Sequence, residues 1–451
     1  MNVAIPQMSL HLNAGLSDVL WILNAYILVY AVLLITAGRL GDLYGPKQLF
    51  LAGLIIFTAA SAACGIAQNP TQMIIFRIVQ GLGGALLTPQ TLSTITMIFP
   101  PSKRGAAFGL WGAVAGVSTV AGPTLGGWLV TDYSWRWIFF VNVPVGVAAF
   151  FLAPRLLQES RDMTVKSFDA LGAVLVTGGL VSLVYAITQS GTYGWGSART
   201  IGVIALSTGL LVGFVLWERR HAEPLMRFGI LRTKTVAGAN VGGLILGTAT
   251  FSMFLMLTLY MQQVLGYSPM KTGVAYLAVA GSAILWSGVA AQLVNRVGVK
   301  PVLVTGMVAL TSGLVYFTQV SVHGSYLGDL LPGFLLVGVG LGFSFVPISI
   351  AALAGVSPAE AGLASGLFNT SQQIGGALGI AVLSTIATSR TSDALAGGST
   401  LPSALIHGFT GAFVVGVGIA AVGVLAALTL IRRDELEHAP AELEPVLDLA
   451  A

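Results

Sequence analysis

Long apolar stretches recur along almost the whole chain, and they limit its possible folds more than any other feature. A helix needs about 20 apolar residues to cross the hydrocarbon core of a bilayer. We therefore predict an all-α polytopic membrane protein with thirteen complete spans, at residues 18–38, 48–67, 71–97, 105–130, 137–154, 168–188, 200–217, 236–261, 273–294, 301–321, 327–352, 361–388 and 404–431.

The composition excludes a large water-soluble enzyme. Hydrophobic residues make up 55% of the 451 residues and charged residues only 8%, whereas soluble domains carry about 25% charged residues. The 57 glycines fit helices that pack closely in a membrane. A lone cysteine, Cys64, can form neither an internal disulfide nor a cysteine-rich metal site. We expect no metal and no cofactor.

The basic residues predict the orientation. If the link between the first two spans is cytoplasmic, sixteen of the 21 Lys and Arg residues fall on the cytoplasmic side. Because cytoplasmic loops are enriched in Lys and Arg, we predict a multi-pass protein of the cell membrane (plasma or inner membrane) with a cytoplasmic C-terminus. The net charge of +4 then reports topology, and we expect no nucleic-acid partner.

The chain also contains an internal repeat. Leu40, Asp42, Gly45 and Lys47 align with Leu293, Asn295, Gly298 and Lys300 at an offset of 253, and Gly81-Leu82-Gly83 aligns with Gly338-Val339-Gly340 at an offset of 257. Both copies of the first motif face the cytoplasm, so the repeats run in the same direction. The predicted division is therefore an N-terminal helical half (1–155), a linker with two inserted transmembrane helices (156–235), a C-terminal half (236–431) and a cytoplasmic tail (432–451).

Several motifs have the spacing of a known transporter family. They are Gly38 to Lys47 between two spans, Arg77-Ile78-Val79-Gln80-Gly81, the glycines from Gly109 to Gly127, the segment 135–144 and the segment 361–370. Together they resemble the major facilitator superfamily, and within it the fourteen-helix drug:proton antiporter branch of the multidrug efflux type. The chain departs from the family pattern at Leu43 and Pro46, where the family usually has basic residues. It also departs at Ser118, where the family has glycine.

The resemblance implies secondary active, proton-coupled efflux of small amphipathic organic compounds or antibiotics by alternating access. The expected partners are the lipid bilayer, a small organic substrate and protons, and the resemblance implies function as a monomer. An importer or facilitator of the same fold and a truncated, non-transporting membrane protein remain alternatives. The sequence lacks a Walker-type loop, a metal-ligand cluster and a nucleophile–base pair, which disfavours an ATP-driven pump or an enzyme.

The N-terminus is expected to be incomplete. Residues 1–17 lie on the outer side and resemble the end of a first helix that is largely missing, which would make fourteen helices in all. We find no carboxylate at mid-depth, since Asp18, Asp169 and Asp329 sit at helix ends. Proton antiport needs a group that gains and loses a proton, and the resemblance implies one upstream of Met1. We therefore expect Met1 to be a miscalled or truncated start.

The first motif has two interpretations. Asp42 can cap a helix N-terminus, where a carboxylate is favoured by the helix dipole. Alternatively, Gly38, Gly41 and Gly45 allow close packing, so that Asp42 and Lys47 latch the two halves when the inner gate is closed. The resemblance favours the latch.

Arg77 lies about six residues inside its span, hence roughly 9 Å deep. It can snorkel to the surface, or it can line a polar cavity together with Gln80, Gly81 and Gly84, which share its helix face. The resemblance implies a role for this arginine in proton coupling.

The motif that resembles the fifth-helix motif of the family is a seam of small residues, with Gly109, Gly122, Gly126, Gly127 and a kink at Pro123. Packing and gating are both open roles for it. A polar stripe at mid-span, formed by Asn369, Gln372 and Gln373, either bonds helices together or lines a substrate cavity. Weaker candidates for the same cavity are Asn24, Tyr26, Gln262 and Gln263, while Trp135, Trp137 and Trp195 are expected in the interfacial belt.

Overall fold

The computed structural model describes residues 1–98, 122, 124–157, 169–221, 224–225, 229, 233–352, 354 and 361–432, and every regular element within them is a helix. These elements are η1 (Asn2–Ala4), α1 (Ile5–Leu12), α2 (Leu16–Tyr44), α3 (Pro46–Ile66), α4 (Pro70–Ile98), α6 (Trp137–Phe140), α7 (Asn142–Leu156), α8 (Ala170–Tyr193), α9 (Ala198–Glu218), α10 (Lys234–Leu259), η3 (Tyr260–Val264), α11 (Pro269–Ala275), α12 (Leu277–Val297), α13 (Val299–Phe317), η4 (Tyr326–Leu330), α14 (Leu331–Ala352), α15 (Ala361–Ala396) and α16 (Leu401–Leu430).

The predicted all-α membrane fold is confirmed. Ten stretches of the described residues are long and apolar enough to cross a membrane, and each overlaps a predicted span. Helices α4 and α15 cover two further predicted spans and are more polar, since they carry Arg77 and the stripe at Asn369. Of the span predicted at 105–130, residues 122 and 124–130 are described, and they are helical.

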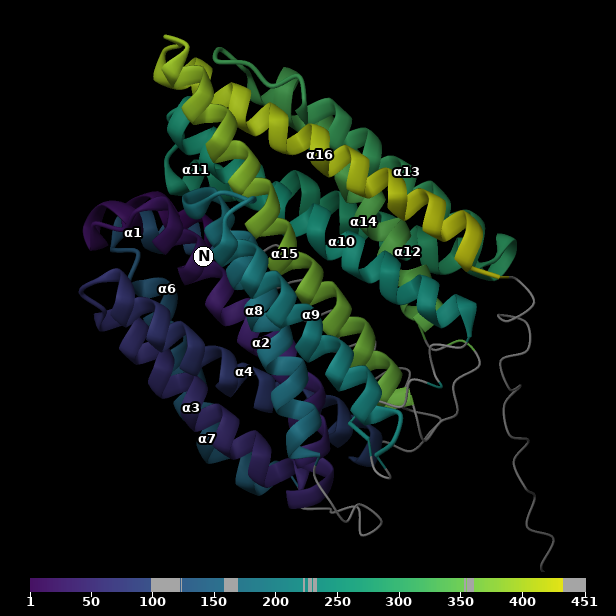
Figure 1. The fold of residues 1–451 in the computed structure, drawn as a ribbon. Coiled ribbons are helices and arrows are strands. Elements are labelled where there is room, and N and C mark those ends of the chain that lie inside the picture. Colours follow the sequence, from purple (N-terminus) through teal and green to yellow (C-terminus); the bar gives the residue numbers. More distant parts are fainter. Residues whose placement is uncertain are drawn as a thin grey trace, which may run out of the picture.

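The helices form two packing groups. In the N-terminal group, α2, α3, α4 and α7 contact one another, and in the C-terminal group α10, α12, α13, α14, α15 and α16 do so. Within the described residues, the two groups meet mainly where α2 lies against α15. In Figure 1 they lie closest together near α1 and α11 and diverge toward the opposite end. We call the end near α1 and α11 the outer end, following the orientation predicted from the basic residues.

Glycines paired by the internal repeat make equivalent contacts in the two groups. A Cβ at Gly83 of α4 would meet the backbone of Phe57 in α3, and a Cβ at Gly340 of α14 would meet the backbone of Leu310 in α13. Both contacts need a residue without a side chain. Gly45 and Gly298, which the repeat also pairs, have φ angles of +99° and +88°, a region that glycine adopts readily. The duplicated sequence therefore specifies the same turns and the same close approaches twice.

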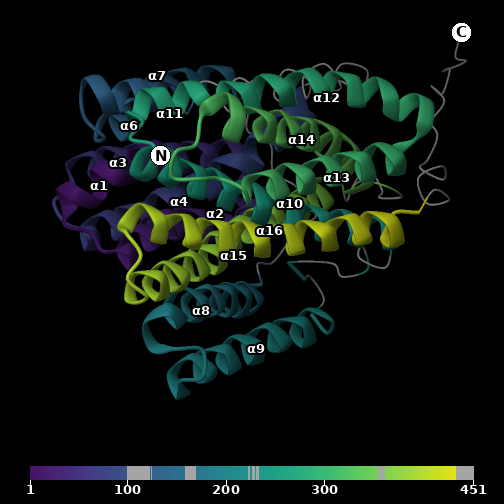
Figure 2. The same cartoon turned by 90° about the horizontal axis from the view of Figure 1, so that it is seen from above.

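Helices α8 and α9 form a hairpin at the edge of the bundle. Figure 2 shows the pair lying beside α15 and outside the two groups. Only 17% of the α9 span is buried, compared with 72% of the span formed by α10 and η3. The hairpin is therefore peripheral, whereas α10 lies in the middle of its group.

Candidate functional site

Arg77 lies inside the protein and does not reach the lipid surface. Its side chain is only 7% exposed. Its Nε donates a hydrogen bond to the carbonyl oxygen of Ile22 in α2 at 3.1 Å, and its Nη1 donates to Oε1 of Gln80 at 2.6 Å. Gln80 in turn donates to Oγ of Ser61 in α3 at 2.6 Å. Arg77 therefore connects three helices of the N-terminal group through one buried chain of hydrogen bonds.

An aromatic ring covers the guanidinium of Arg77. The ring of Tyr26 lies 4.2 Å from the guanidinium carbon, and Phe139 lies 6.0 Å away on another side. Tyr26 also stacks on Tyr30 at a centroid distance of 5.8 Å. A desolvated cation over an aromatic face is stabilised by about 2 kcal/mol or more. Gly81 permits this arrangement, since a Cβ there would lie 2.7 Å from the carbonyl oxygen of Tyr26.

Asn24 is buried without a hydrogen-bond partner among the described residues. It lies on α2 two residues from Tyr26 and is 0% exposed, and within the described part of the chain neither its Oδ1 nor its Nδ2 has a partner. A buried amide without hydrogen bonds costs about 1–3 kcal/mol or more. Two residues along a helix correspond to a rotation of about 200°, so Asn24 points away from the face on which Ile22 contacts Arg77. Its neighbours one turn away, Leu20 and Ile27, pack into the core that contains α10 and α15 residues.

The polar stripe on α15 faces partly open space. Asn369, Gln372 and Gln373 are all half-buried. Within the part of the chain that the structure describes, no hydrogen bond is made by the side-chain amides of Gln372 and Gln373. The adjacent Ser371 instead donates to Oδ1 of Asn240 in α10 at 3.0 Å. The interhelical bond at this level is therefore made beside the stripe, and the two glutamine amides are left available to water or a ligand.

The first motif lies at the inner end of α2 and α3. Gly41 of α2 packs against the side chain of Gln90 in α4, which donates to the carbonyl oxygen of Ala37 at 2.8 Å. A Cβ at Gly38 would lie 3.7 Å from Cβ of Pro89 in α4, and Gly45 forms the turn into α3. These glycines bring α2 and α4 into close contact. The side chain of Asp42 lies outside the described residues.

Lys47 bonds within its own helix group in this structure. Its Nζ donates to the carbonyl oxygen of Pro154 in the last turn of α7 at 3.0 Å. A cation at a helix C-terminus is favoured by the helix dipole. In this conformation Lys47 thus ties α3 to α7 and makes no hydrogen bond to the described residues of the C-terminal group.

The described glycines of the seam between Gly109 and Gly127 differ in how closely neighbouring residues approach them. Gly109 and Pro123 lie outside the described residues. Among the described residues, a Cβ at Gly122 or at Gly126 would meet nothing within 4 Å. A Cβ at Gly127, in contrast, would lie 2.6 Å from the carbonyl oxygen of Pro269 in α11. Of the three described glycines of this seam, Gly127 is therefore the one where the two helix groups touch backbone to backbone.

Two hydrogen bonds join the groups at the same outer end. Oγ1 of Thr131 accepts from the backbone N–H of Met270 at 3.1 Å, and Nε2 of Gln262 donates to the carbonyl oxygen of Val3 at 3.0 Å. Gln262, expected to be a weak candidate for the cavity, thus contributes to closing the outer end. These contacts place the structure in a conformation whose outer end is closed.

The prediction for Trp135 is wrong. This side chain is 1% exposed and packs with Cys64, Met73 and Phe139 in a core of the N-terminal group. The neighbouring Arg136 donates to the carbonyl oxygens of Gly65 in α3 and of Ala67 directly after it, and its guanidinium lies 4.5 Å from the centre of the Trp135 ring. The other two tryptophans, Trp137 and Trp195, are 47% and 53% exposed, as interfacial residues would be.

Sequence reasoning also missed three polar residues. Ser61 and Gln90 complete the buried bonds around α4, and Thr131 completes the outer contact. Each is a polar residue within or at the end of an apolar span, which was the available signal. The sequence does not show which helix face such a residue occupies.

Comparisons with known proteins agree with the fold and with the motifs. A sequence model described as Major Facilitator Superfamily matches residues 1–380. The chain is 37% identical to the tetracenomycin C resistance and export protein of Streptomyces glaucescens, with 87% of this chain and 73% of that protein covered. It is 35% identical to the puromycin resistance protein pur8 of Streptomyces alboniger, over 96% and 87%. It is 32% identical to the multidrug transporter protein MdtP of Bacillus subtilis, over 84% and 70%.

Solved structures share the fold at low sequence identity. A POT family transporter, PepTSo, superposes with a TM-score of 0.65 at 12% identity, covering 95% of this chain and 94% of that one. The nucleoside transporter NupG gives a TM-score of 0.60 at 12% identity, over 96% and 95%. These two show the fold alone. The family match and the relatives above 30% identity establish that the chain belongs to the Major Facilitator Superfamily.

Proposed function

We propose that the protein exports small amphipathic organic compounds from the cell by alternating access, with proton entry as the driving force. The observation that carries this proposal is the identity of 32–37%, over most of the chain, with proteins named for antibiotic export, antibiotic resistance and multidrug transport. The proposal involves no chemical conversion of the substrate, so it includes no enzymatic step. It places the protein in the cell membrane as a functional monomer with its C-terminus in the cytoplasm.

The packing supports a two-state cycle. We take 1–155 and 236–431 as the halves that rock against each other and 156–235 as the linker with the inserted hairpin. The contacts of Gly127, Thr131 and Gln262 close the outer end in one state. In the other state these contacts break and the inner ends approach, where Asp42 and Lys47 are proposed to latch.

Buried polar groups define the proposed pathway. Asn24 on α2 is buried with no hydrogen-bond partner among the described residues, and Gln372 and Gln373 lie half-buried on α15, so amides are present on the two helices at which the groups meet. A substrate with carbonyl, hydroxyl or amine groups would satisfy them, and apolar residues around them would bind its rings and chains. Arg77, held by Gln80 beneath Tyr26, is proposed to couple substrate movement to protons.

Transport in proteoliposomes tests the proposal. Purified protein is reconstituted and offered a panel of dyes and antibiotics with and without a pH gradient across the membrane. We expect movement of at least one aromatic amphipathic compound, opposite in direction to the protons, and its loss in the Arg77→Gln protein. Movement in the same direction as the protons would identify the importer alternative. A protein that folds but moves no compound faster than empty vesicles do would contradict the proposal.

A further inference from the structure

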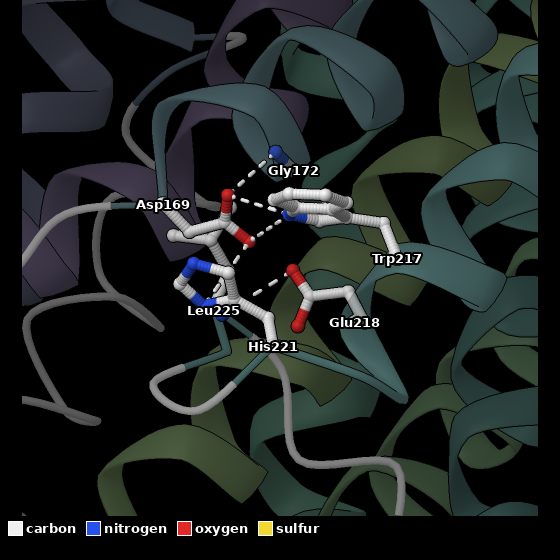
Figure 3. Close-up of polar contacts among 6 residues, drawn as sticks. All are labelled: Asp169, Gly172, Trp217, Glu218, His221 and Leu225. Carbon is white, nitrogen blue, oxygen red and sulfur yellow. Dashed lines mark hydrogen bonds and ion pairs between the residues drawn. The ribbon is translucent and has the colours of Figure 1, made fainter.

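The hairpin of α8 and α9 is a stiff unit. At its inner end, Asp169 accepts from the backbone N–H of Gly172 at 2.8 Å and from Nε1 of Trp217 in α9 at 2.9 Å, as Figure 3 shows. In the middle, Ser207 of α9 donates to the carbonyl oxygen of Gly179 in α8 at 2.7 Å. The two helices are thus bonded at both of these levels.

The remaining bonds secure both ends of the hairpin. Glu218 accepts from the backbone N–H of Leu225, so the segment that leaves α9 is tied back to it. At the outer end, Arg199 of α9 donates to the hydroxyl of Tyr185 in α8 at 2.6 Å and lies over the ring of Tyr193. With bonds at three levels, α8 and α9 cannot move independently of each other.

The contact between the hairpin and α2 is directional. Oγ of Ser17 donates to Oε1 of Gln189 at 3.3 Å, and the ring of Trp21 lies 5.9 Å from that of Tyr185. Further along, Val184 packs in one cluster with residues of α2 at positions 28 and 32. Hydrogen bonds and aromatic pairs depend on both distance and angle. This contact therefore holds α8 in one register on α2.

The described contacts between the hairpin and α15 are apolar. Phe214 of α9 packs on Leu367 of α15, with Leu175 and Val176 of α8 beside them. Nearer the middle, Leu378 of α15 packs against the cluster formed by α2 and α8. Apolar contact is non-directional and depends on buried area. Helix α15 can therefore slide past the hairpin while these side chains remain covered.

A stiff hairpin that touches both groups cannot keep both sets of contacts unchanged when the groups rotate. We propose that the hairpin moves as one body with the N-terminal group, fixed through α2, and serves as the surface along which α15 slides. The hairpin then covers the line between α2 and α15 in both states and excludes lipid from it. This inference rests on the proposed alternating access.

Distances between three exposed positions test it. Ile55 on α3, Leu206 on α9 and Val422 on α16 are 52%, 56% and 54% exposed, so spin labels there do not disturb packing. Each pair of positions is replaced by cysteine in a Cys64→Ala background and measured by electron–electron double resonance in nanodiscs at acidic and neutral pH. The Gly127→Ala substitution, which opposes closure of the outer end, is added to populate the second state.

The expected pattern is specific. The Ile55–Val422 and Leu206–Val422 distances should change together by more than about 2 Å, the scale of a domain rearrangement, while the Ile55–Leu206 distance stays constant. A constant Leu206–Val422 distance with a changing Ile55–Leu206 distance would show that the hairpin moves with the C-terminal group and would overturn the inference. A constant Ile55–Val422 distance under all conditions would refute the alternating access itself, and the inference with it.

Cross-linking gives a functional readout of the same inference. A short bifunctional methanethiosulfonate, released by reductant, bridges Ser17→Cys to Gln189→Cys and so locks α8 to α2. The cross-linked protein should transport at the rate of the reduced protein. The matched pair Phe214→Cys and Leu367→Cys, which locks α9 to α15, should lose transport when bridged and regain it on reduction. Loss of transport in the first pair alone would overturn the inference.

Discussion

Replacing Gly127 by alanine should prevent the outer end from closing fully. The added Cβ would lie 2.6 Å from the carbonyl oxygen of Pro269, 3.0 Å from Cα of Met270 and 3.1 Å from the carbonyl carbon of Pro269. Ordinary contacts between such atoms are about 3.5 Å. All three atoms belong to the backbone, which cannot rotate aside as a side chain can. The two helices must therefore separate by roughly 0.9 Å.

The geometry sets the size of the effect. Inserting a methyl group into a packed contact of this kind costs about 1–3 kcal/mol. The clash exists only while the outer end is closed, so its free energy acts on the equilibrium between the two states. A difference of about 1–3 kcal/mol changes the ratio of closed to open molecules by about 5- to 150-fold.

The neighbouring Gly126 provides the control. Replacing Gly126 by alanine gains the same helix propensity, about 1 kcal/mol. Its added Cβ, however, would meet none of the described residues within 4 Å. Spin labels at Tyr133 and Val274, which are 60% and 44% exposed near the outer end, report the opening. We expect Gly127→Ala to shift the distance distribution toward longer values and Gly126→Ala to leave it unchanged. Identical distributions for the two variants would refute the argument that this backbone contact is the outer closure.

Three further predictions follow from single buried groups. Arg77→Gln should leave membrane insertion unchanged and lower the free energy of unfolding by about 2 kcal/mol, since the contact of the cation with Tyr26 is lost, but should abolish gradient-driven transport; transport at the parental rate would show that the fixed charge is not needed. Asn24→Leu should raise the free energy of unfolding by about 1–3 kcal/mol, because two unpaired amide atoms are removed, and should slow transport; no gain in stability would mean that ordered water satisfies the amide. Asp169→Ala should destabilise the hairpin by about 1–3 kcal/mol, because the helix cap and the hydrogen bond from Trp217 are lost. The loss should appear as faster proteolysis at the ends of α8 and α9, and an unchanged cleavage rate would contradict this role.

The sequence by itself determined the order and approximate limits of the membrane helices that the structure describes. Burying apolar side chains in lipid requires runs of about 20 residues, and such runs are recognisable without any knowledge of their neighbours. The turns at Gly45 and Gly298 and the close approaches at Gly83 and Gly340 were also present in the sequence as a repeat. These features are local, or they depend on residues that have no side chain.

The tertiary structure decided which face of each helix meets which neighbour. In a soluble helix, the polar face marks the side turned to water. In a membrane helix, lipid is as apolar as the protein interior, so the sequence carries little information on which side packs. This is why Trp135 was predicted at the interface and lies in the core, and why Arg77 had two open interpretations until its bonds to Ile22 and Gln80 were known.

The position of the inserted hairpin shows the same limit. The repeat separated residues 168–217 from the two halves, because they have no partner at the repeat offset. Their contacts with α2 and α15 involve Ser17, Gln189 and Leu367, which lie far apart along the chain. No periodicity within one helix encodes such a contact, since it depends on the shape of a surface built by two other helices. The sequence therefore set these two helices apart from the repeated segments, and only the assembled bundle decided that α8 packs against α2 and α15.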